Sequence, residues 1–485
     1  MNVSLAKIYA LIVFSLLIRL ISMSYHQALV EEAYYWNYAM HLDWSYLDHP
    51  PMVAFLIHLS RMILGDHEWA IRLPAVLCWM GTAFYAYRFS EIIQKNTGVY
   101  ALLFISILPY FFLQSMFMTP DLPLMFAWSA TLYYLYSAIV LNKKSFFYLA
   151  SISLGLGLLS KYTIFLLVPV TLIFITFVPE YRIWWKRKEL YLGAFIVLIL
   201  FSPVLYWNAT HEWASFVFQS SQRIQDTRQF STHLLILFLI FFLMPTGIWG
   251  LWQLFKPRRQ NTTFLFFKMF TLLPMSVFAI VSLHNQIKFN WLGPIGLSLI
   301  PWLAILLEQN QFPKRLLSSL WALLPVYLVS MMLMISAKPA MMYKLLFHRY
   351  PDWQGMSLAL NELAKHYEIK EGIAPTILPM DKYNMASELT FYQNKALQKQ
   401  QIEKIYPILG QHVLDNPSLM YQFWDKAQNH HGETVILVAW KESDLDLNYP
   451  EDVLHKESKK HILWVYDPRH HYPLLPVYYQ VAVLT

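Results

Sequence analysis

The sequence Leu29-Val-Glu-Glu-Ala-Tyr-Tyr-Trp36, followed by Leu47-Asp-His-Pro-Pro51, stands directly after an apolar run from Ile8 to Met23. A helical run of this kind approaches the length needed to cross about 30 Å of hydrocarbon. It lacks a small-residue cleavage site, which predicts a retained span rather than a signal peptide. Carboxylates are costly to hold near lipid, so a dense acidic and aromatic cluster just beyond a span indicates a functional site.

The composition indicates a polytopic membrane protein. The chain has 485 residues, of which 57% are hydrophobic and only 14% charged. Apolar runs of roughly 18 to 22 residues recur along it. The segment Pro51–Gly65 is apolar but too short to span, and we expect an interfacial or re-entrant helix there. We expect about eleven spans, over residues 8–24, 69–90, 98–118, 122–141, 146–160, 162–179, 190–206, 232–254, 263–283, 291–307 and 315–336.

Charge predicts the orientation of these spans. With Pro51–Gly65 kept outside, most Lys and Arg of the short loops fall on the cytoplasmic side, as the positive-inside rule requires. The net charge of +7 therefore indicates topology rather than binding to nucleic acid. The N-terminus is expected inside and residues 337–485 outside. The ionisable residues expected on the outer face are Glu31, Glu32, Asp48, Asp121, Lys161, His211, Arg223, His284 and Lys288.

The last third of the chain has a different character. From Lys338 onward the charge density rises, and short β-like runs appear at Thr434–Trp440 and His461–Tyr466. The segment Met356–Tyr367 has helical spacing. We therefore predict a transmembrane domain over residues 1–336, with an outer loop at 25–68, and an extracytoplasmic α/β domain over 337–485. The single cysteine, Cys78, lies in an apolar run, which excludes a disulfide framework and a thiolate metal site.

Several motifs resemble one family. The two stretches quoted first resemble the first outer loop of the bacterial protein-mannosyltransferase-like, ArnT-like branch of the GT-C membrane glycosyltransferases. Members typically read Asp-Glu-Ala-Tyr-Tyr-Trp, so Glu31 extends the usual carboxylate by one methylene. Further stretches that resemble the family are Met118-Thr-Pro-Asp-Leu-Pro123, Gly155-Leu-Gly-Leu-Leu-Ser-Lys-Tyr162, Trp207–Phe216 with Gln222-Arg223, Phe289-Asn-Trp291 with Pro294, and Asp381–Tyr392.

The resemblance implies a fold, a reaction and a location. The fold is a GT-C bundle with an outer α/β domain. The reaction moves a sugar from a polyprenyl-phosphate donor to lipid A, another glycolipid or glycan, or a protein. It takes place on the periplasmic face of the bacterial inner membrane. The implied partners are the donor, a lipid or protein acceptor and membrane lipids, without nucleic acid. No cofactor is expected; a divalent metal is left open but not indicated.

Sugar transfer to a hydroxyl needs a base for its proton and cations near the leaving phosphate. The resemblance makes Glu31 the expected base and Asp121 a residue that positions the base or the acceptor, with Glu32 as a third catalytic candidate. If the acceptor is itself a phosphate, Glu31 would only orient groups. Arg19 is a further phosphate candidate. The expected substrate-binding residues are Asp48, His49, Tyr34, Tyr35, Lys161, Tyr162, Arg223, Lys288 and Asn290.

The charged candidates have structural alternatives. Glu31 and Glu32 are alternatively ordinary loop charges at a span exit. Asp121 is alternatively the cap of a helix that begins at Leu122, because Asp is a favoured N-cap. Lys161 alternatively extends its amine to the membrane interface.

The first loop has alternatives of its own. Asp48 and His49 could ligate a metal, although Asp-His-Pro-Pro is also what a rigid turn requires. Tyr34, Tyr35 and Trp36 are alternatively an aromatic belt at the membrane surface rather than a platform for a sugar.

Two other classes of protein are compatible with many spans and outer charges. A transporter or flippase of lipid-linked sugars should carry buried ionisable residues in broken, repeated helices, and no such pairing stands out in the sequence. A polymerase or ligase of lipid-linked glycans should have a large outer loop between spans, whereas the large outer region here is C-terminal.

Overall fold

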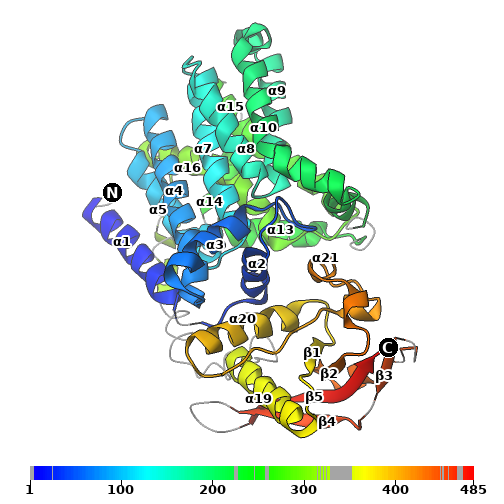
Figure 1. The fold of residues 1–485 in the computed structure, drawn as a ribbon. Helices are drawn as coiled ribbons and strands as arrows, with labels where there is room; N and C mark the ends of the chain where they lie inside the picture. The colour runs from blue at the N-terminus through cyan, green and yellow to red at the C-terminus, as the bar shows by residue number, and fades with distance from the viewer. Residues whose placement is uncertain are drawn as a thin grey trace. The chain divides into compact units, whose positions relative to one another are not determined.

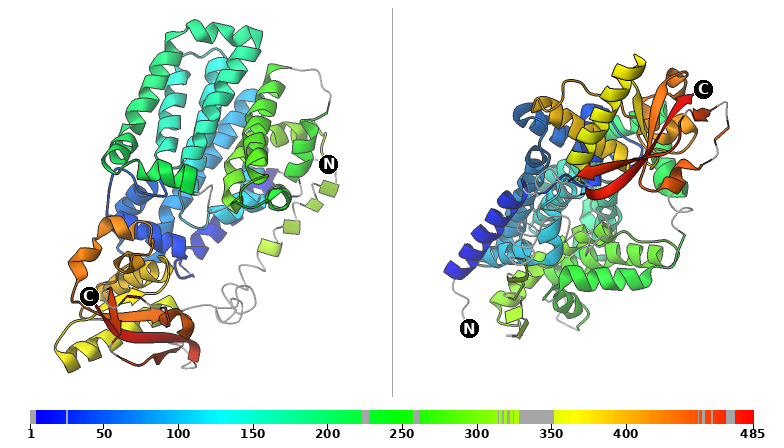
Figure 2. Two further views of the ribbon diagram at one scale, coloured as in Figure 1. Left: turned by 90° about the vertical axis from the view of Figure 1, so that its right-hand side faces the viewer. Right: turned by 90° about the horizontal axis from the view of Figure 1, so that it is seen from below.

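A computed structural model describes residues 5–24, 26–222, 228–244, 246–256, 261–313, 315–316, 318–319, 322–323, 325–327, 352–447, 449–450, 453–456, 458–466 and 473–485. The chain divides into two compact units. Unit 1 comprises Met1–Met23, Asp43–Leu56 and Arg72–Val329, and unit 2 comprises Ser24–Leu42, Ile57–Ile71 and Ser330–Thr485. The helices and strands of both units are drawn in Figures 1 and 2.

Unit 1 is helical throughout its described residues. Its α-helices are α1 (Leu5–Ser22), α4 (Glu68–Ile93, which begins in unit 2), α5 (Gly98–Ile107), α6 (Pro109–Gln114), α7 (Asp121–Ile139), α8 (Phe146–Leu158), α9 (Leu167–Phe177), α10 (Lys188–Thr210), α11 (Ala214–Val217), α13 (Thr232–Leu243), α14 (Thr246–Gln253), α15 (Thr262–Ser282) and α16 (Leu299–Glu308). Shorter helical turns are η1 (Tyr162–Leu166), η2 (Pro179–Lys186), η3 (Phe218–Gln222) and η4 (Phe289–Ser298).

Helix α8 packs against both α7 and α10 (Figure 2). Glycines permit the close approach to α10. A Cβ atom on Gly155 would lie 2.7 Å from Leu200 Cδ1, and one on Gly193 would lie 2.4 Å from Ser151 Oγ. Small residues at such contacts let helices approach closely where lipid supplies no hydrophobic driving force between them.

Three helices of the described chain are long and apolar enough to cross a membrane: Lys188–Thr210, Thr262–Ser282 and Asn290–Glu308. Two bent pairs, Tyr162–Phe177 with Pro179–Lys186 and Thr232–Phe241 with Thr246–Gln253, raise this number to as many as five. Four other apolar segments form helices of 10–17 residues, which are Ile8–Ser22, Met52–Leu64, Gly98–Ile107 and Phe146–Leu158. The count of eleven spans stays a prediction.

Two of the predicted apolar segments have informative boundaries. The segment Pro51–Gly65 forms α3 (Met52–Leu64), and its 13 residues confirm a helix too short to span. The predicted span 98–118 is not one helix, because it breaks between α5 and α6. Leu108 there adopts φ −57° and ψ 133°, and the following Pro109 has no N–H to continue the helix.

Unit 2 combines helices with one mixed sheet. Its elements are α2 (Val30–Met40), α19 (Trp353–Glu371), β1 (Thr376–Pro379), α20 (Asn384–Gln398), η5 (Gln411–Leu414), α21 (Tyr421–Trp424), η6 (Ala427–His430), β2 (Thr434–Ala439), η7 (Glu442–Leu445), β3 (Leu454–Lys456), β4 (His461–Tyr466) and β5 (Pro473–Leu484).

The sheet order is β1-β2-β5-β3, and β4 also pairs with β5. Strands β1 and β2 are parallel, with Thr376 opposite Val435, and α20 lies in the connection between them. Strand β5 runs antiparallel to β2, β3 and β4. Every residue of β1 and β2 is buried, as expected for strands covered on both faces.

The predicted strands at Thr434–Trp440 and His461–Tyr466 and the helix at Met356–Tyr367 are confirmed as β2, β4 and α19. Strand β5 was missed, because Pro473 and Pro476 argue against a strand in sequence. In the structure Pro473 is the first residue of β5, where its missing N–H is tolerated.

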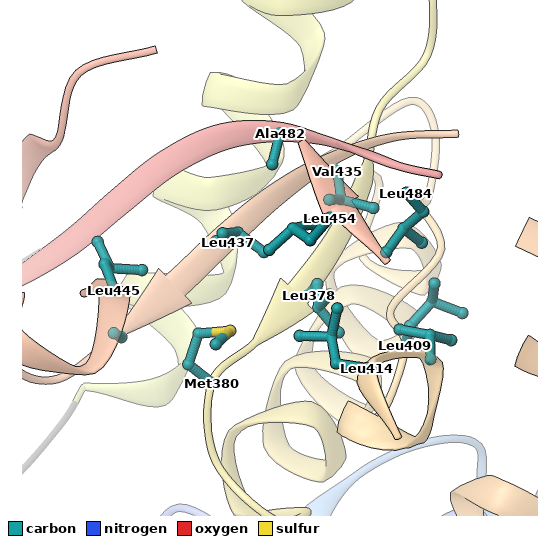
Figure 3. Close-up of a cluster of buried hydrophobic side chains, with 12 residues drawn as sticks. Leu378, Met380, Leu409, Leu414, Val435, Leu437, Leu445, Leu454, Ala482 and Leu484 are labelled. Carbon is teal, nitrogen blue, oxygen red and sulfur yellow. The ribbon is translucent and has the colours of Figure 1, made fainter. Parts of the chain in front are cut away.

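The core of the α/β part lies between the sheet and the segment 409–414 (Figure 3). Leu378, Val435 and Leu437 contribute from β1 and β2, and Leu409 and Leu414 pack against them. Strands β1 and β2 consist mainly of β-branched and leucine side chains, which favour strands and whose burial stabilises this part of the chain.

The division into units differs from the one predicted at residue 336. The segments 24–42 and 57–71, which the sequence assigned to the outer loop of the membrane domain, group with the C-terminal residues. Helix α2 packs on α20 within unit 2. The physical reason is a polar network that sequence patterns do not reveal.

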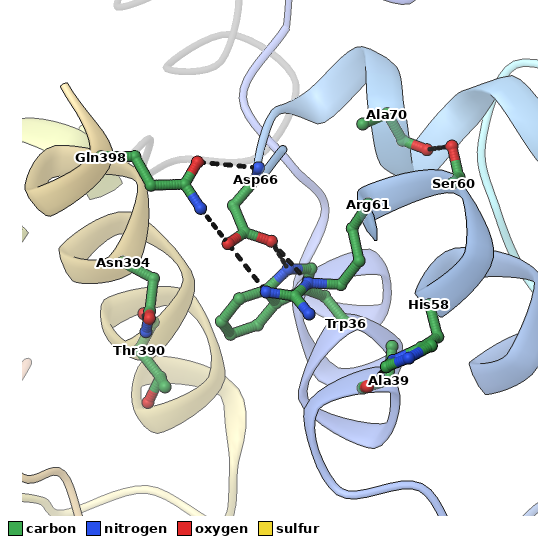
Figure 4. A network of polar contacts seen from close by, with 10 residues as sticks. All are labelled: Trp36, Ala39, His58, Ser60, Arg61, Asp66, Ala70, Thr390, Asn394 and Gln398. Carbon is green, nitrogen blue, oxygen red and sulfur yellow. Dashed lines mark hydrogen bonds and ion pairs between the residues drawn. The ribbon is translucent and has the colours of Figure 1, made fainter. Parts of the chain in front are cut away.

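Asp66 is the centre of this network (Figure 4). Arg61 donates to its two oxygens from Nε at 2.7 Å and Nη2 at 3.0 Å. Trp36 Nε1 donates to the same carboxylate at 2.7 Å and Gln398 Nε2 at 2.5 Å. The carboxylate is 1% exposed, and these four donors together satisfy it. One buried carboxylate thus joins α2 and α3 to α20.

Asp66→Ala should lower the stability of unit 2 by about 1–3 kcal/mol, because it leaves the buried indole N–H of Trp36 without its acceptor and the part-buried Arg61 without its counter-charge. The measurement is thermal unfolding of the purified protein in detergent. Glu403→Ala is the matched control, because it breaks the exposed Lys365–Glu403 pair and should cost at most about 1 kcal/mol. Equal shifts of the two midpoints would contradict the assigned role of Asp66.

Candidate active site

A buried ion pair joins the start of α7 to the end of α8. Lys161 Nζ lies 2.7 Å from Asp121 Oδ1, and the two residues are 8% and 1% exposed. Asn290 donates from Nδ2 to the other oxygen, Asp121 Oδ2, at 2.6 Å. Asp121, Lys161 and Asn290 are far apart in sequence, so the fold brings together three predicted site residues.

The two structural alternatives for this pair do not describe it. Asp121 is the first residue of α7 rather than its cap, and its two oxygens accept bonds from Lys161 and Asn290. Lys161 is buried against Asp121 instead of reaching to a surface. The negative charge of Asp121 is also favourable at the N-terminus of a helix.

The Asp-His-Pro-Pro segment forms a turn that is fixed to this region of unit 1. Met52, at the start of α3, donates its N–H to Leu159 O at 2.9 Å, two residues before Lys161. Gln219 Nε2 donates to the carbonyl of Asp48 at 2.5 Å. The rigid-turn interpretation of Asp48 and His49 is supported. Among the residues that the structure describes, no group of three or more His, Cys, Asp or Glu side chains could hold a metal ion.

An apolar groove of about 920 Å³ lies on α7, α8, α9 and α10. Its walls include Leu154, Leu158, Val197 and Leu198, together with many other aliphatic and aromatic side chains. At one end it is lined by Tyr162, Phe216, Gln219 and Ser220.

Tyr162 marks the polar end of the groove. Its ring packs edge-on against Phe216, and its hydroxyl lies 2.9 Å from Ser215 Oγ. Tyr162 directly follows Lys161 in the chain, so one lining residue of the groove is the sequence neighbour of the buried ion pair, whose two members do not themselves line the groove. An apolar groove of this kind suits the apolar part of an amphiphile.

The two glutamates of the first motif differ in their surroundings. Both lie in the first turn of α2, in unit 2. Glu32 is fully buried, and its Oε2 accepts the N–H of Leu29 at 3.0 Å, which helps to fix the start of the helix. Glu31 is exposed. Of the two, Glu31 therefore has the freedom to meet a substrate, and Glu32 has a structural contact.

Tyr34 and Tyr35 are buried inside unit 2 rather than exposed as an aromatic belt. The ring of Tyr34 lies 4.7 Å from that of Tyr383, and its hydroxyl accepts the N–H of Met420 at 3.2 Å. Trp36 is equally buried and donates to Asp66, as described above. A sugar contact for these tyrosines stays a prediction.

Other predicted residues have less to report, and one residue was missed. Lys288 is exposed just before η4. Arg223 lies outside the described residues.

Tyr110 was not predicted, because it is embedded in an apolar run; its hydroxyl donates to the carbonyl of Asn290 at 3.4 Å. In unit 2, burial raises the pKa of Asp381 to about 6, and this carboxyl accepts the N–H of Met385 at the start of α20.

Comparisons with known proteins agree with the resemblance in the motifs. Residues 48–207 match the model of the family described as dolichyl-phosphate-mannose-protein mannosyltransferase. This segment contains Asp48, Asp121, Lys161 and Tyr162. The resemblance inferred from the motifs is confirmed, and the fold is the ArnT-like GT-C fold.

The fold assignment rests on two crystal structures of ArnT from Cupriavidus metallidurans. The apo structure superimposes with a TM-score of 0.62 at 12% identity, over 98% of each chain. The structure bound to undecaprenyl phosphate gives 0.65 at 13% identity, over 99% of this chain and 98% of that one.

Two relatives are similar in sequence. The lipid A galacturonosyltransferase RgtD of Rhizobium johnstonii is 24% identical over 312 residues, which are 60% of this chain and 63% of that protein. An uncharacterized protein of Aquifex aeolicus is 27% identical over 161 residues, 32% of this chain and 31% of that protein. The chain thus matches less than two thirds of the length of either relative.

Lys161→Ala should destabilise unit 1 by about 3–5 kcal/mol, because it leaves the Asp121 carboxylate buried without a counter-charge. The double variant Lys161→Met with Asp121→Asn should lose less than the sum of the single variants. Thermal midpoints of the purified proteins test this, with Lys404→Ala in the exposed Lys404–Glu368 pair as the control. Strict additivity would mean that the two side chains do not interact.

Proposed function

We propose that this protein is a membrane glycosyltransferase that moves a sugar from a polyprenyl-phosphate donor to lipid A or a related lipid. The observation that carries the proposal is the apolar groove of about 920 Å³ whose lining includes Tyr162, the residue that follows Lys161 of the buried Asp121–Lys161 pair. The ArnT-like fold and the similarity to a protein named as a lipid A galacturonosyltransferase support it.

The groove suits the donor. A polyprenyl phosphate has an apolar tail that must stay out of water and an anionic head at the membrane surface. The aliphatic walls on α8 and α10 match the tail. A soluble nucleotide sugar has no tail to place there. The solved ArnT that resembles this chain was crystallised with undecaprenyl phosphate, a lipid of this chemistry.

Lys161 can hold the phosphate while Asp121 holds Lys161. An ammonium group carries three donors, and the bond to Asp121 uses one of them. The others are available for charge-assisted bonds to a phosphate oxygen, where negative charge develops as the sugar departs. Asn290 fixes the second oxygen of Asp121 and so keeps the pair oriented. Lys288 and Arg223 are further cations for the same phosphate.

Glu31 supplies the base in this scheme when the acceptor is a hydroxyl. An exposed carboxylate at the start of α2 can take the hydroxyl proton as the oxygen attacks the sugar, a contribution of about 10²–10⁴ in rate. When the acceptor is a phosphate of lipid A, no proton has to be removed and Glu31 orients the attacking group.

The finer architecture belongs to the same proposal. We place the protein in the bacterial inner membrane with about eleven spans, in the orientation that the positive-inside rule favours. The active site and the C-terminal α/β domain then face the periplasm, where lipid-linked sugars and lipid A meet. One feature that a transporter would also need, a buried cation beside a broken span, is present at Arg19. The transfer assay below separates the two classes.

Transfer should depend on the two carboxylates. Purified protein is incubated with undecaprenyl phosphates that carry different monosaccharides, galacturonic acid among them, and with lipid A from a deletion strain. Wild-type protein should glycosylate the lipid, and mass spectrometry should detect the added mass of the sugar. Glu31→Gln should lower turnover by about 10²–10⁴-fold when the acceptor is a hydroxyl. Asp121→Asn should lower it by about 10²-fold, because Lys161 loses the partner that orients it. Glu403→Gln, an exposed residue of unit 2, should leave turnover unchanged.

Two outcomes would contradict the proposal. One is near wild-type turnover in both Glu31→Gln and Asp121→Asn at normal expression. The other is equal activity with a nucleotide sugar in the absence of any lipid donor. Movement of a lipid-linked sugar across vesicles without any transfer would favour the transporter class.

Filling the groove should weaken use of the donor without disturbing the fold. Ala194 lines the groove on α10, and Ala194→Trp should raise the KM for the lipid donor several-fold by occupying the place of the tail. Leu192→Trp is the matched control, since Leu192 is exposed on the same helix but does not line the groove. An unchanged KM for the lipid donor in Ala194→Trp would show that the donor tail does not bind in this groove.

A further inference from the structure

Arg19 is fully buried in α1 and makes no ion pair with a carboxylate among the described residues. Its Nε donates to Ser115 Oγ at 2.5 Å, and its Nη1 donates to the carbonyl of Ser15 at 2.8 Å. The guanidinium also lies over the rings of Trp79 and Phe112, at 4.1 Å and 4.8 Å from their centroids. A buried cation in a membrane span is costly and therefore indicates a function.

Arg19 stands at the break between α5 and α6. Its Nη2 donates to the carbonyl of Phe111 at 3.4 Å, inside α6. The carbonyls freed by the break are satisfied by side chains, that of Ser106 by Ser15 Oγ at 3.0 Å and that of Ile107 by the hydroxyl of Tyr327 at 2.7 Å. Broken helices are tolerated within a membrane only when such groups are satisfied internally. Arg19 and its neighbours therefore fix the direction of α6.

Helix α6 carries Tyr110 to the ion pair. The ring of Tyr110 packs directly on Gly293 of η4, where a Cβ atom would lie 1.7 Å from Cζ of the ring. The hydroxyl of Tyr110 donates to the carbonyl of Asn290, and Asn290 donates to Asp121. A continuous chain of contacts inside unit 1 thus runs from Arg19 through α6 and η4 to Asp121.

We propose that Arg19 is a positioning residue for sugar transfer, which holds α6 so that Tyr110 keeps Asn290 on Asp121. The expected effect on kcat rests on the proposed function. The expected energetic coupling between Arg19 and Asn290 does not depend on that function. Lysine keeps the charge but has no planar fork to reach Ser15, Ser115 and Phe111 together, so Arg19→Lys tests the geometry rather than the charge.

The test combines Arg19→Lys with Tyr110→Phe and Asn290→Ala in double-variant cycles. Arg19→Lys should lower kcat by roughly 10- to 100-fold, as a small misplacement of a reacting group does, with the donor KM changed less than twofold. Adding Tyr110→Phe should lower kcat little further, because both variants act on one path. Ser115→Ala, which removes one partner of Arg19, serves if Arg19→Lys fails to fold.

Arg88→Lys is the control, since Arg88 donates to the hydroxyl of Tyr133 and lies over the ring of Phe84, and neither residue belongs to the chain of contacts from Arg19 to Asp121. Its effects should add to those of Tyr110→Phe. Thermal midpoints of the same variants, measured without substrate, should be non-additive for Arg19→Lys with Tyr110→Phe and for Arg19→Lys with Asn290→Ala, and additive for either partner with Arg88→Lys. Additive midpoints, or an Arg19→Lys defect confined to KM, would overturn the inference. Coupled midpoints in a protein without transfer activity would instead overturn the proposed function.

Discussion

An apolar surrounding offers no water to a broken helix or a buried charge, so every such group must find its partner inside the protein. The Asp121–Lys161 pair meets this constraint with Asn290 as third member, and both oxygens of the carboxylate are used. Charge is thus held in place before a substrate arrives. The free-energy cost of removing these charged groups from water arises during folding rather than during binding. The ion pair is therefore already ordered when the anionic head of the proposed donor binds.

The same constraint shapes the break between α5 and α6. A proline ends the hydrogen-bonded ladder, and the carbonyls of Ser106 and Ile107 accept instead from Ser15 of α1 and from Tyr327. The helix that follows is short and points Tyr110 at η4. The irregular stretches α6 and η4 carry Tyr110 and Asn290 to the first residue of α7, Asp121, while the apolar groove lies on α7, α8, α9 and α10.

In unit 2, buried side chains and a hydrogen-bonded carboxylate hold helix α2 against the C-terminal part of the chain. Helix α2 carries both glutamates of the first motif, and its tyrosines are buried by Tyr383, Met420 and other residues of the C-terminal part. Asp66 adds a satisfied charge that fixes Trp36 and Arg61 to Gln398. The first motif therefore owes its shape to residues more than 300 positions away, and the exposed Glu31 stands on a rigid base.

Sequence patterns predicted local features well. The apolar runs gave the helices α1, α4, α7, α8, α10 and α15 within a few residues, and β2, β4 and α19 follow from their own periodicity. Patterns fail where a proline has a positional meaning, as in β5 and at the α5–α6 break. They also single out Asp121, Lys161 and Asn290, but they predict Lys161 as a phosphate contact and do not predict its ion pair with Asp121.

What the sequence by itself determined is therefore the membrane class, the short helix α3, the polar motifs and the α/β character of the C-terminal part, because these depend on neighbouring residues and on burial of apolar runs. Only the tertiary structure decided that Asp121 binds Lys161 and Asn290, that Glu32 is buried while Glu31 is exposed, and that residues 24–42 group with unit 2. The physical reason is that an ion pair or a buried hydrogen bond depends on distances between segments remote in the chain, which local spacing does not contain.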